Sequence, residues 1–224
     1  MSRVRRSQAP TEASGEPFFD AINRKDWPQV WAIGGSNLSP SYQEMVAGYD
    51  RTAHDDPAIY FDDGSLVRLV LLAAETTGAT QLYDASYTVA SGSIVRGSLM
   101  LQRTDSGSGF EGLAGKWGGH GRGLQITNGG LAVMWFRSYN DCGASPVQPC
   151  DSRDGDNLVD GGLRSFRLTS IDGASATGRA IGGTVRQSPS VVVRLDQSQG
   201  TVSVSGSEGA PFCNASAAPG TCGA

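Results

Sequence analysis

The architecture of this chain depends most on residues 66–101, which read LVRLVLLAAETTGATQLYDASYTVASGSIVRGSLML. The segment opens with a run rich in Leu and Val at 66–74 and then alternates polar and apolar residues at 81–89. After the turn formers Ser-Gly, the apolar residues resume at 94–101. A shorter apolar segment at 58–61 precedes them. This spacing predicts a curved antiparallel sheet whose strands follow one another along the chain.

Residues 16–49, which precede the strands, have the apolar spacing of helices. Asp26 is placed to cap the second of three helices, with Pro28 tolerated in its first turn. The glycine pair 34–35 is expected to end that helix, and a third helix is expected over residues 41–49. Three helices followed by a curved sheet predict an α+β domain over residues 16–103.

The second half of the chain has a different pattern. Residues 104–112, TDSGSGFEG, read as a linker and place a domain boundary there. Beyond them, short apolar segments are separated by Gly, Asn, Asp or Pro. This pattern predicts an all-β domain over residues 113–224, built as a small barrel or a sandwich. Residues 1–15 mix Arg, Ser, Pro, Thr and Glu, and they read as a disordered linker.

The charge of the chain is modest, with a formal net charge of −4. A nucleic-acid partner would need a basic stripe to neutralise phosphates, so no such partner is expected. The longest apolar stretch, residues 66–74, is interrupted by Arg68 and is too short to span a bilayer. The sequence after Arg6 lacks the apolar region of a signal peptide, so we expect that any exporting segment has been trimmed. Contact with a membrane is expected only through a missing N-terminal anchor.

All four cysteines stand in the second half, as Cys142 and Cys150 and then Cys213 and Cys222. Four cysteines allow three pairings, and the loop-forming residues inside each pair favour Cys142–Cys150 and Cys213–Cys222. A zinc site is the competing use, but it usually has tighter Cys-x2–4-Cys spacing. Because disulfides persist in oxidising compartments, the sequence predicts an extracytoplasmic protein, either secreted or anchored at the cell surface.

Residues 19–35, FDAINRKDWPQVWAIGG, resemble the opening of a group of largely uncharacterised extracytoplasmic domains from high-GC Gram-positive bacteria. The likeness continues through residues 41–42, 48–49 and 83–89. These domains look like the NTF2-like cone fold, in which helices pack on a curved sheet and enclose a pocket. They occur in lipoproteins and in the outer portions of membrane-anchored signalling proteins. The resemblance implies a cone domain with a pocket, and it leaves the function open because this fold hosts both enzymes and binders.

Residues 115–122, GKWGGHGR, and the cysteine pairs resemble a β domain of similar secreted proteins. The tripeptide Gly115-x-Trp117 is similar to the first strand of lipocalin- and avidin-like barrels, where the tryptophan plugs one end of the barrel. In the same run, His120 and Arg122 are candidates to contact an anion or another ligand, because glycine permits close backbone approach. The competing interpretation is an irregular first strand in which His120 is hydrogen-bonded locally.

Two groups in the first half are candidate site residues. The aromatic residues of the predicted cone domain could line an apolar pocket or could pack as its core: Trp27, Trp31, Tyr49, Phe61 and Tyr87. The cluster His54, Asp55 and Asp56 could perform general acid–base catalysis near a pocket mouth. Since Pro57 follows directly, the same cluster could equally be a turn with solvated carboxylates.

A further cluster of carboxylates follows Cys150, at Asp151, Asp154, Asp156 and Asp160. Clustered carboxylates can bind calcium. The spacing departs from an EF-hand loop, because Leu158 stands at the fifth position of a loop that starts at Asp154. A solvated loop is therefore the alternative, and no cofactor or metal is expected.

These features together predict a non-catalytic, sensor-like module of the cell envelope that binds a small apolar ligand or an envelope protein. The alternative is an NTF2-like enzyme that acts on a small apolar substrate by acid–base catalysis through His54, Asp55 or Asp56.

Overall fold

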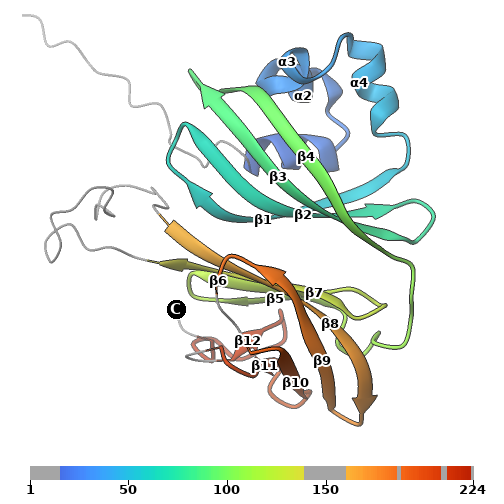
Figure 1. Cartoon of the computed structure of the whole chain (residues 1–224), viewed down its shortest axis with the longest axis vertical. Coiled ribbons are helices and arrows are strands. Elements are labelled where there is room, and N and C mark those ends of the chain that lie inside the picture. The colour runs from blue at the N-terminus through green and yellow to red at the C-terminus, as the bar shows by residue number, and fades with distance from the viewer. Residues whose placement is uncertain (1–15, 139–159, 186–187, 208–210, 223–224) are drawn as a thin grey trace, which may run out of the picture.

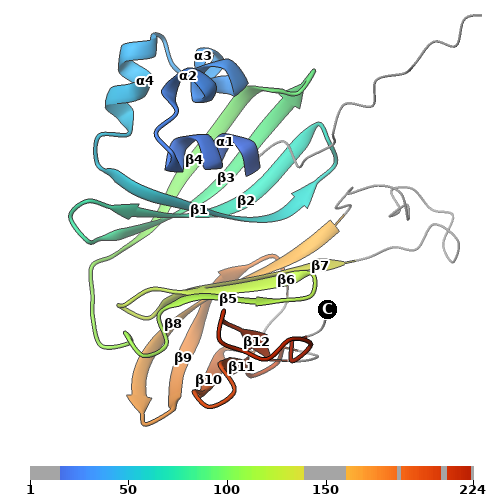
Figure 2. The same ribbon diagram turned by 180° about the vertical axis from the view of Figure 1, so that it is seen from behind.

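The structure, a computed structural model, describes residues 16–138, 160–185, 188–207 and 211–222. It forms three layers: a group of helices, a four-stranded sheet and a closed barrel (Figure 1). The view from behind shows the helices over one face of the sheet and the barrel against the other (Figure 2). Within the described ranges, every helix is too short or too polar to cross a membrane.

The helical layer begins with α1 (Glu16–Asn23), which buries Phe18, Phe19 and Ile22 against the sheet. The next helix, α2 (Trp27–Val30), starts at Asp26, whose side chain accepts a hydrogen bond from the backbone N–H of Gln29 at 3.2 Å. This bond satisfies one of the free N–H groups of the first turn. The prediction that Asp26 caps the second helix is confirmed.

The prediction that residues 34–35 end the second helix is wrong. The helical turns continue through η1 (Trp31–Gly35, a π-helix) and α3 (Ser36–Leu38), and α4 (Tyr42–Gly48) follows. A Cβ on Gly34 would lie 2.6 Å from the Cβ of Ile94, and one on Gly35 would collide with the sulfur of Met45. These glycines therefore allow the helical turns to approach their neighbours closely, and they do not serve as a stop.

The sheet contains β1 (Thr52–Asp62), β2 (Leu66–Glu75), β3 (Thr80–Ala90) and β4 (Ser93–Asp105), paired antiparallel in chain order. Strand β2 is buried on both of its faces. Leu69 and Leu71 belong to the core under the helices, whereas Val70 and Leu72 belong to the core against the barrel. A strand that is covered on both sides needs a continuous apolar sequence, which explains the run at 66–74.

The prediction of an α+β, NTF2-like cone with three helices on a curved sheet is wrong. The described chain is mostly strand, and its helical pieces are short. The second face of the sheet is covered by a barrel through a shared core of Ala58, Val70, Leu72, Leu82, Leu131, Val133 and Leu163. The physical reason is that β2 carries apolar side chains on both faces, so the sheet needs two covering layers and not the single helical layer of a cone.

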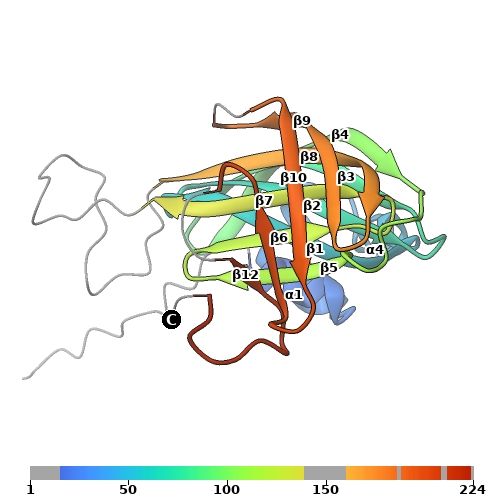
Figure 3. The ribbon, with the colours of Figure 1, turned by 90° about the horizontal axis from the view of Figure 1, so that it is seen from below.

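The barrel begins with β5 (Gly115–Gly119), β6 (Arg122–Ile126) and β7 (Leu131–Ser138). It continues with β8 (Asp160–Asp172), β9 (Ser175–Gly183), β10 (Ser190–Asp196), β11 (Thr201–Val204) and β12 (Phe212–Cys213). The strands close in the order β10-β11-β12-β5-β6-β7-β8-β9, seen from below in Figure 3. Trp117 is buried inside, and its indole N–H donates to the carbonyl of Leu113 at 3.0 Å. Of the two architectures predicted for this half, the chain adopts the barrel.

The C-terminal end of the chain is joined to β12 by a disulfide between Cys213 and Cys222, whose Cα atoms are 5.8 Å apart. This pair is as predicted, whereas Cys142 and Cys150 lie outside the described residues. Strand β4 runs to Asp105, inside the stretch predicted as a linker, and Phe110 of the same stretch packs into the barrel core.

Candidate functional site

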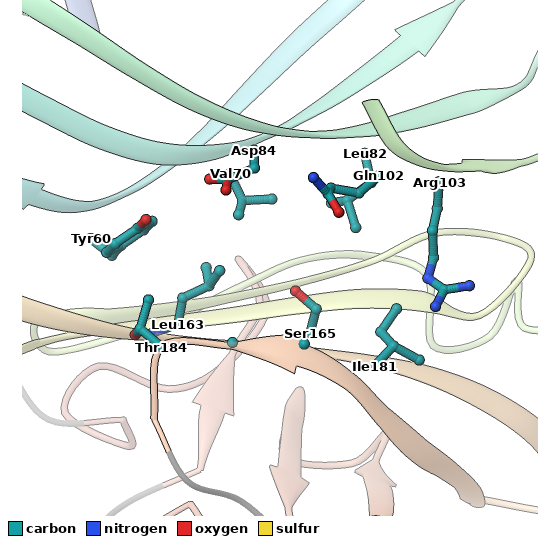
Figure 4. A pocket seen from close by; sticks show the side chains of 12 residues that line it. Tyr60, Val70, Leu82, Asp84, Gln102, Arg103, Leu163, Ser165, Ile181 and Thr184 are labelled. Carbon is teal, nitrogen blue, oxygen red and sulfur yellow. The ribbon is translucent and has the colours of Figure 1, made fainter. Parts of the chain in front are cut away.

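A groove opens where the sheet and the barrel do not meet completely (Figure 4). Its volume is about 210 Å³. The apolar part of its wall is formed by Val70, Leu82, Leu163 and Ile181. The polar part is formed by Tyr60, Asp84, Gln102, Arg103, Ser165 and Thr184. Sheet and barrel contribute to both sets, so the groove exists only because the two layers pack together.

Strand alternation explains why apolar and polar side chains share this groove. Leu82 and Asp84 are two residues apart on β3, so both point toward the barrel. On β8, Leu163 and Ser165 point toward the sheet for the same reason, while Phe166 turns into the barrel core. Each strand therefore places one apolar and one polar residue side by side on the groove wall.

Two irregularities in the strands bring one further polar and one further apolar side chain to the groove. In β4, Leu101 pairs with Tyr83 and Arg103 pairs with Leu82, which leaves Gln102 as an extra residue. In β9, an equivalent shift leaves Ile181 unpaired, because Ser165 pairs with Gly182 and Phe166 with Ala180. Bulges of this kind turn side chains away from the regular alternation. Here they bring extra side chains to the groove from both layers.

Most of the polar groups in the groove are not used by the fold. Across the described ranges, the side chains of five lining residues make no hydrogen bond or ion pair: Tyr60, Asp84, Gln102, Arg103 and Ser165. Thr184 differs, because its hydroxyl accepts a hydrogen bond from the backbone N–H of Leu163 at 2.9 Å. Asp84, Gln102 and Arg103 are exposed to solvent, whereas Tyr60 is partly buried and Ser165 is buried. The groove therefore offers a set of donors and acceptors with spare capacity over an apolar surface.

The electrostatics of the groove keep Tyr60 as a hydrogen-bond donor. Burial raises the pKa of the Tyr60 phenol, the carboxylate of Asp84 raises it further, and Arg68 acts in the opposite direction. Since an ordinary tyrosine already titrates near pH ~10, the phenol stays protonated at neutral pH. Figure 4 shows Tyr60 near one end of the groove and Arg103 reaching from the sheet side toward the barrel.

A second hollow of about 270 Å³ shares Tyr60 and Asp84 with the groove. It continues along the barrel-facing side of the sheet past Arg68, Ser98 and Met100. The hollowed surface thus follows β3 and β4 for some distance beyond the groove.

Two polar joints hold the barrel to the outer strands of the sheet. At β4, Asp105 is bound by the guanidinium of Arg167 at 2.6 Å and by the hydroxyl of Thr127. Burial alone would raise the pKa of Asp105, but the bonds from Thr127 and Arg167 and the charge of Arg167 lower it overall. At β1, the side-chain amide of Gln125 donates to Asp56 at 2.6 Å, and the ammonium of Lys116 also contacts Asp56.

The structure separates the predicted catalytic cluster. His54 and Asp56 lie together, with the His54 Nε2 2.9 Å from the Asp56 Oδ1, in the joint with the barrel. Asp55 points to the other face of β1, where it is 3% exposed and its Oδ1 has no hydrogen-bond partner among the described residues. Burial raises the pKa of Asp55 to about 6, with His54 lowering it and Asp56 raising it. These residues are therefore not arranged as one acid–base group.

The predicted pocket aromatics lie mainly between the helices and the sheet. Trp27 stacks on Tyr49 with ring centroids 5.6 Å apart, and Tyr87 contacts the rings of both Phe18 and Phe19. Trp31 meets Tyr42 edge to face. Phe61 stands apart from this group, because the guanidinium of Arg68 lies 5.4 Å from its ring centre. These rings pack against one another, and none of the five predicted residues lines the groove.

The second-half candidates are placed as follows. The backbone N–H of His120, in the turn between β5 and β6, donates to the carbonyl of Cys222 at 3.3 Å. Arg122 lies 4.7 Å from the centre of the Phe212 ring and donates to the Pro211 carbonyl, and burial lowers the pKa of its guanidinium. Both residues therefore help to hold the C-terminal segment against the hairpin.

The proposed calcium cluster is mostly beyond the part of the chain that the structure describes. Asp151, Asp154 and Asp156 lie outside it, and Asp160 starts β8. Within the described ranges, no three His, Cys, Asp or Glu side chains are grouped as metal ligands would be.

Sequence reasoning missed the groove residues, because all of them except Thr184 are ordinary strand residues. Asp84 gives no signal in β3, because Ser86 and Thr88, which share its face, are polar as well. Comparison with protein-family models, with curated proteins and with solved structures gave no match.

Proposed function

We propose that this chain is a non-catalytic extracytoplasmic binding module, and that the groove between sheet and barrel is its ligand site. The observation that carries the proposal is the set of unpaired polar side chains at Tyr60, Asp84, Gln102, Arg103 and Ser165 over an apolar wall. Ligand sites combine apolar surface with a few convergent polar groups in this way.

The chemistry of the groove defines the class of ligand. The carboxylate of Asp84 accepts hydrogen bonds and the guanidinium of Arg103 donates them. The Tyr60 phenol and the Gln102 amide can each donate and accept. A ligand with many hydroxyl groups therefore matches the groove better than a purely apolar ligand. Both signs of charge line the groove, which favours a neutral molecule. Pockets that hold drug-sized ligands have volumes of roughly 300–1,000 Å³. With about 210 Å³, the groove fits a molecule of monosaccharide size.

The disulfide supports the extracytoplasmic part of this proposal. Cys213 and Cys222 are bonded, and such bonds persist where the surroundings are oxidising. The separation of Asp55 from His54 and Asp56 on opposite faces of β1 supports binding in preference to acid–base catalysis by that cluster.

The affinity test uses N-acetylglucosamine as the probe, titrated into the full chain and followed by NMR. The variant Asp84→Ala/Ser165→Val removes two unpaired groove groups, and Asp172→Ala/Ser190→Val makes the same chemical changes at exposed positions elsewhere. We expect saturable binding by the wild type, a Kd at least about tenfold weaker for the groove variant, and a Kd within about twofold for the control. Equal affinities for all three proteins, or no saturable binding by the wild type, would overturn the proposal.

A further inference from the structure

The outer edges of the two outer strands of the sheet, β1 and β4, are covered to different extents. Along β1, the side chain of Asn23 takes the place of a partner strand: its amide donates to the carbonyl of Asp55 at 2.8 Å and its oxygen accepts from the N–H of Asp55 at 2.7 Å. Further along, Gly161 of β8 approaches the carbonyl of Tyr60 so closely that a Cβ would not fit. The edge of β1 is therefore covered.

The edge of β4 is covered only at its start. There the amide of Asn37 donates to the carbonyl of Ile94 at 2.9 Å. Beyond Ile94, within the described residues, β4 pairs with β3 alone. Register shifts occur on either side of residues 96–101, and between them the pairing with β3 is regular. Residues 96–101 contain no proline and no bulge, so the unpaired N–H and C=O groups of this stretch can template a further strand.

The exposed side chains of β4 are unusually apolar. Leu99, Met100 and Leu101 are consecutive and are 51%, 58% and 51% exposed, and Val95 is also exposed. Leu99 and Leu101 pair with Ala85 and Tyr83, so they lie on the helix-covered face of the sheet, beyond the helices. Met100 lies on the other face of β4, so Leu99 and Leu101 form the exposed apolar pair of this face, at an edge where a further strand can add.

The charges of β4 lie on the opposite face. Arg96 and Arg103 pair with Thr88 and Leu82 of β3, so they flank Met100 on the face turned toward the barrel. Neither arginine has an ion pair among the described residues. Asp105 is buried and already bound to Arg167, and Asp84 lies one strand further in. The free edge is therefore basic, although the chain as a whole carries a net charge of −4.

We infer that the free edge of β4 binds an extended peptide with alternating apolar and acidic residues. The peptide adds a strand beside residues 96–101 through backbone hydrogen bonds. Its apolar side chains cover Leu99 and Leu101 on one face, and its carboxylates lie between Arg96 and Arg103 on the other. This inference needs no ligand in the groove, although Arg103 lines the groove as well.

A second copy of the chain fits this edge less well. If two β4 strands paired antiparallel about a two-fold axis normal to the sheet, the Arg96 end of one strand would meet the Arg103 end of the other on the same face. Like charges placed opposite each other in a sheet are destabilising. Charge complementarity therefore favours an acidic peptide over self-association.

The test measures binding of two capped heptapeptides to the full chain, one alternating Val with Glu and one alternating Val with Lys. The variant Arg96→Glu/Arg103→Glu reverses the edge charges, and Arg179→Glu/Arg194→Glu makes the same reversal at exposed positions on β9 and β10. We expect the Glu peptide to bind the wild type and the control at least about tenfold more tightly than the edge variant. The edge variant should prefer the Lys peptide.

Two further arms distinguish the mode of binding. A Glu peptide that is N-methylated at every residue has no N–H group left on either edge, so it cannot form the ladder and should not bind. Every second amide of residues 96–101 points away from β3, and its hydrogen exchange should be fast in the free chain and slow in the complex. The groove variant Asp84→Ala/Ser165→Val should bind the Glu peptide like the wild type, which separates failure of this inference from failure of the groove proposal.

Three results would overturn the inference: equal binding of both peptides, binding that survives N-methylation, or protection of these amides in the free chain. Concentration-dependent dimerisation that the edge reversal abolishes would also overturn it, in favour of a second copy as the occupant.

Discussion

Asp55 and Asp56 are neighbours in β1, yet they serve different layers of the molecule. The carboxylate of Asp56 is bound by Gln125 of the barrel at 2.6 Å. The carboxylate of Asp55 is buried under the helices, with one oxygen unpaired among the described residues. Strand alternation alone sends the two side chains to opposite faces. One carboxylate therefore joins the layers, while the other is a source of pH sensitivity.

The first prediction concerns Asp55 and pH. Burial raises its folded pKa from 3.8 to about 6, so the folded state binds the proton more tightly than the unfolded state between these values. The free energy of unfolding is therefore highest at the low-pH end of this range. It falls by about 3 kcal/mol as the pH rises from 3.8 to about 6, which is about 1.4 kcal/mol per pH unit. In Asp55→Asn most of this fall should be absent. Urea unfolding from pH 4 to pH 7 measures it, and identical pH slopes in the two proteins would contradict the assignment.

The second prediction concerns the joint at Asp105. Arg167→Ala leaves the carboxylate of Asp105 buried without its cation, so the free energy of unfolding should drop by about 2–3 kcal/mol. This loss is smaller than for a fully buried ion pair, because Arg167 is partly exposed. Arg194→Ala, on an exposed part of β10, should change it by less than about 0.5 kcal/mol. Urea unfolding at pH 7 compares the three proteins. A drop no larger than that of the control would show that the joint adds nothing to stability.

The third prediction concerns the disulfide. The bond between Cys213 and Cys222 spans nine positions of sequence and closes a short loop, so Cys213→Ser/Cys222→Ser should lose about 2–3 kcal/mol of stability. Thermal unfolding with and without reductant measures this loss. Reductant should lower the melting temperature of the wild type by breaking this bond, an effect that the double variant should lack. An unchanged melting temperature in the variant would count against a stabilising role.

The fourth prediction concerns the close contact of the two layers at Gly161. A Cβ at this position would strike the carbonyl of Tyr60, so Gly161→Ala should push β8 away from β1 and destabilise the fold by about 1–3 kcal/mol. Gly48→Ala is the matched control, since nothing lies within 4 Å of its Cβ position. Denaturant unfolding of both variants gives the comparison. Equal free energies of unfolding for the two variants would mean that β8 and β1 can move apart at Gly161 without loss of stability.

Local chemistry was readable from the sequence. The cap at Asp26 and the bond between Cys213 and Cys222 both depend on residues close together in the chain, and both were predicted. The role of Gly34 was not readable, because the side chain that excludes a Cβ there belongs to Ile94, far along the sequence. A glycine that ends a helix and one that permits close packing look alike in one dimension.

The layer arrangement and the groove were beyond sequence reasoning for a related physical reason. The run at 66–74 was compatible with one buried face or two, and only the packing of Leu163 against the sheet decides it. Tyr60, Asp84 and Ser165 come from strands that meet only when the barrel covers the sheet. The extra residues at Gln102 and Ile181 arise from strand register, which depends on partners and not on the strand itself.

The most direct test of the binding-module account is to map where N-acetylglucosamine perturbs the backbone amides of the 15N-labelled full chain. We predict that the shifted amides cluster at the groove, at Asp84, Gln102, Arg103, Ser165 and residues 181–184. Shifts confined to the helical layer around Tyr49 and Tyr87, or no saturable shifts at all, would contradict it.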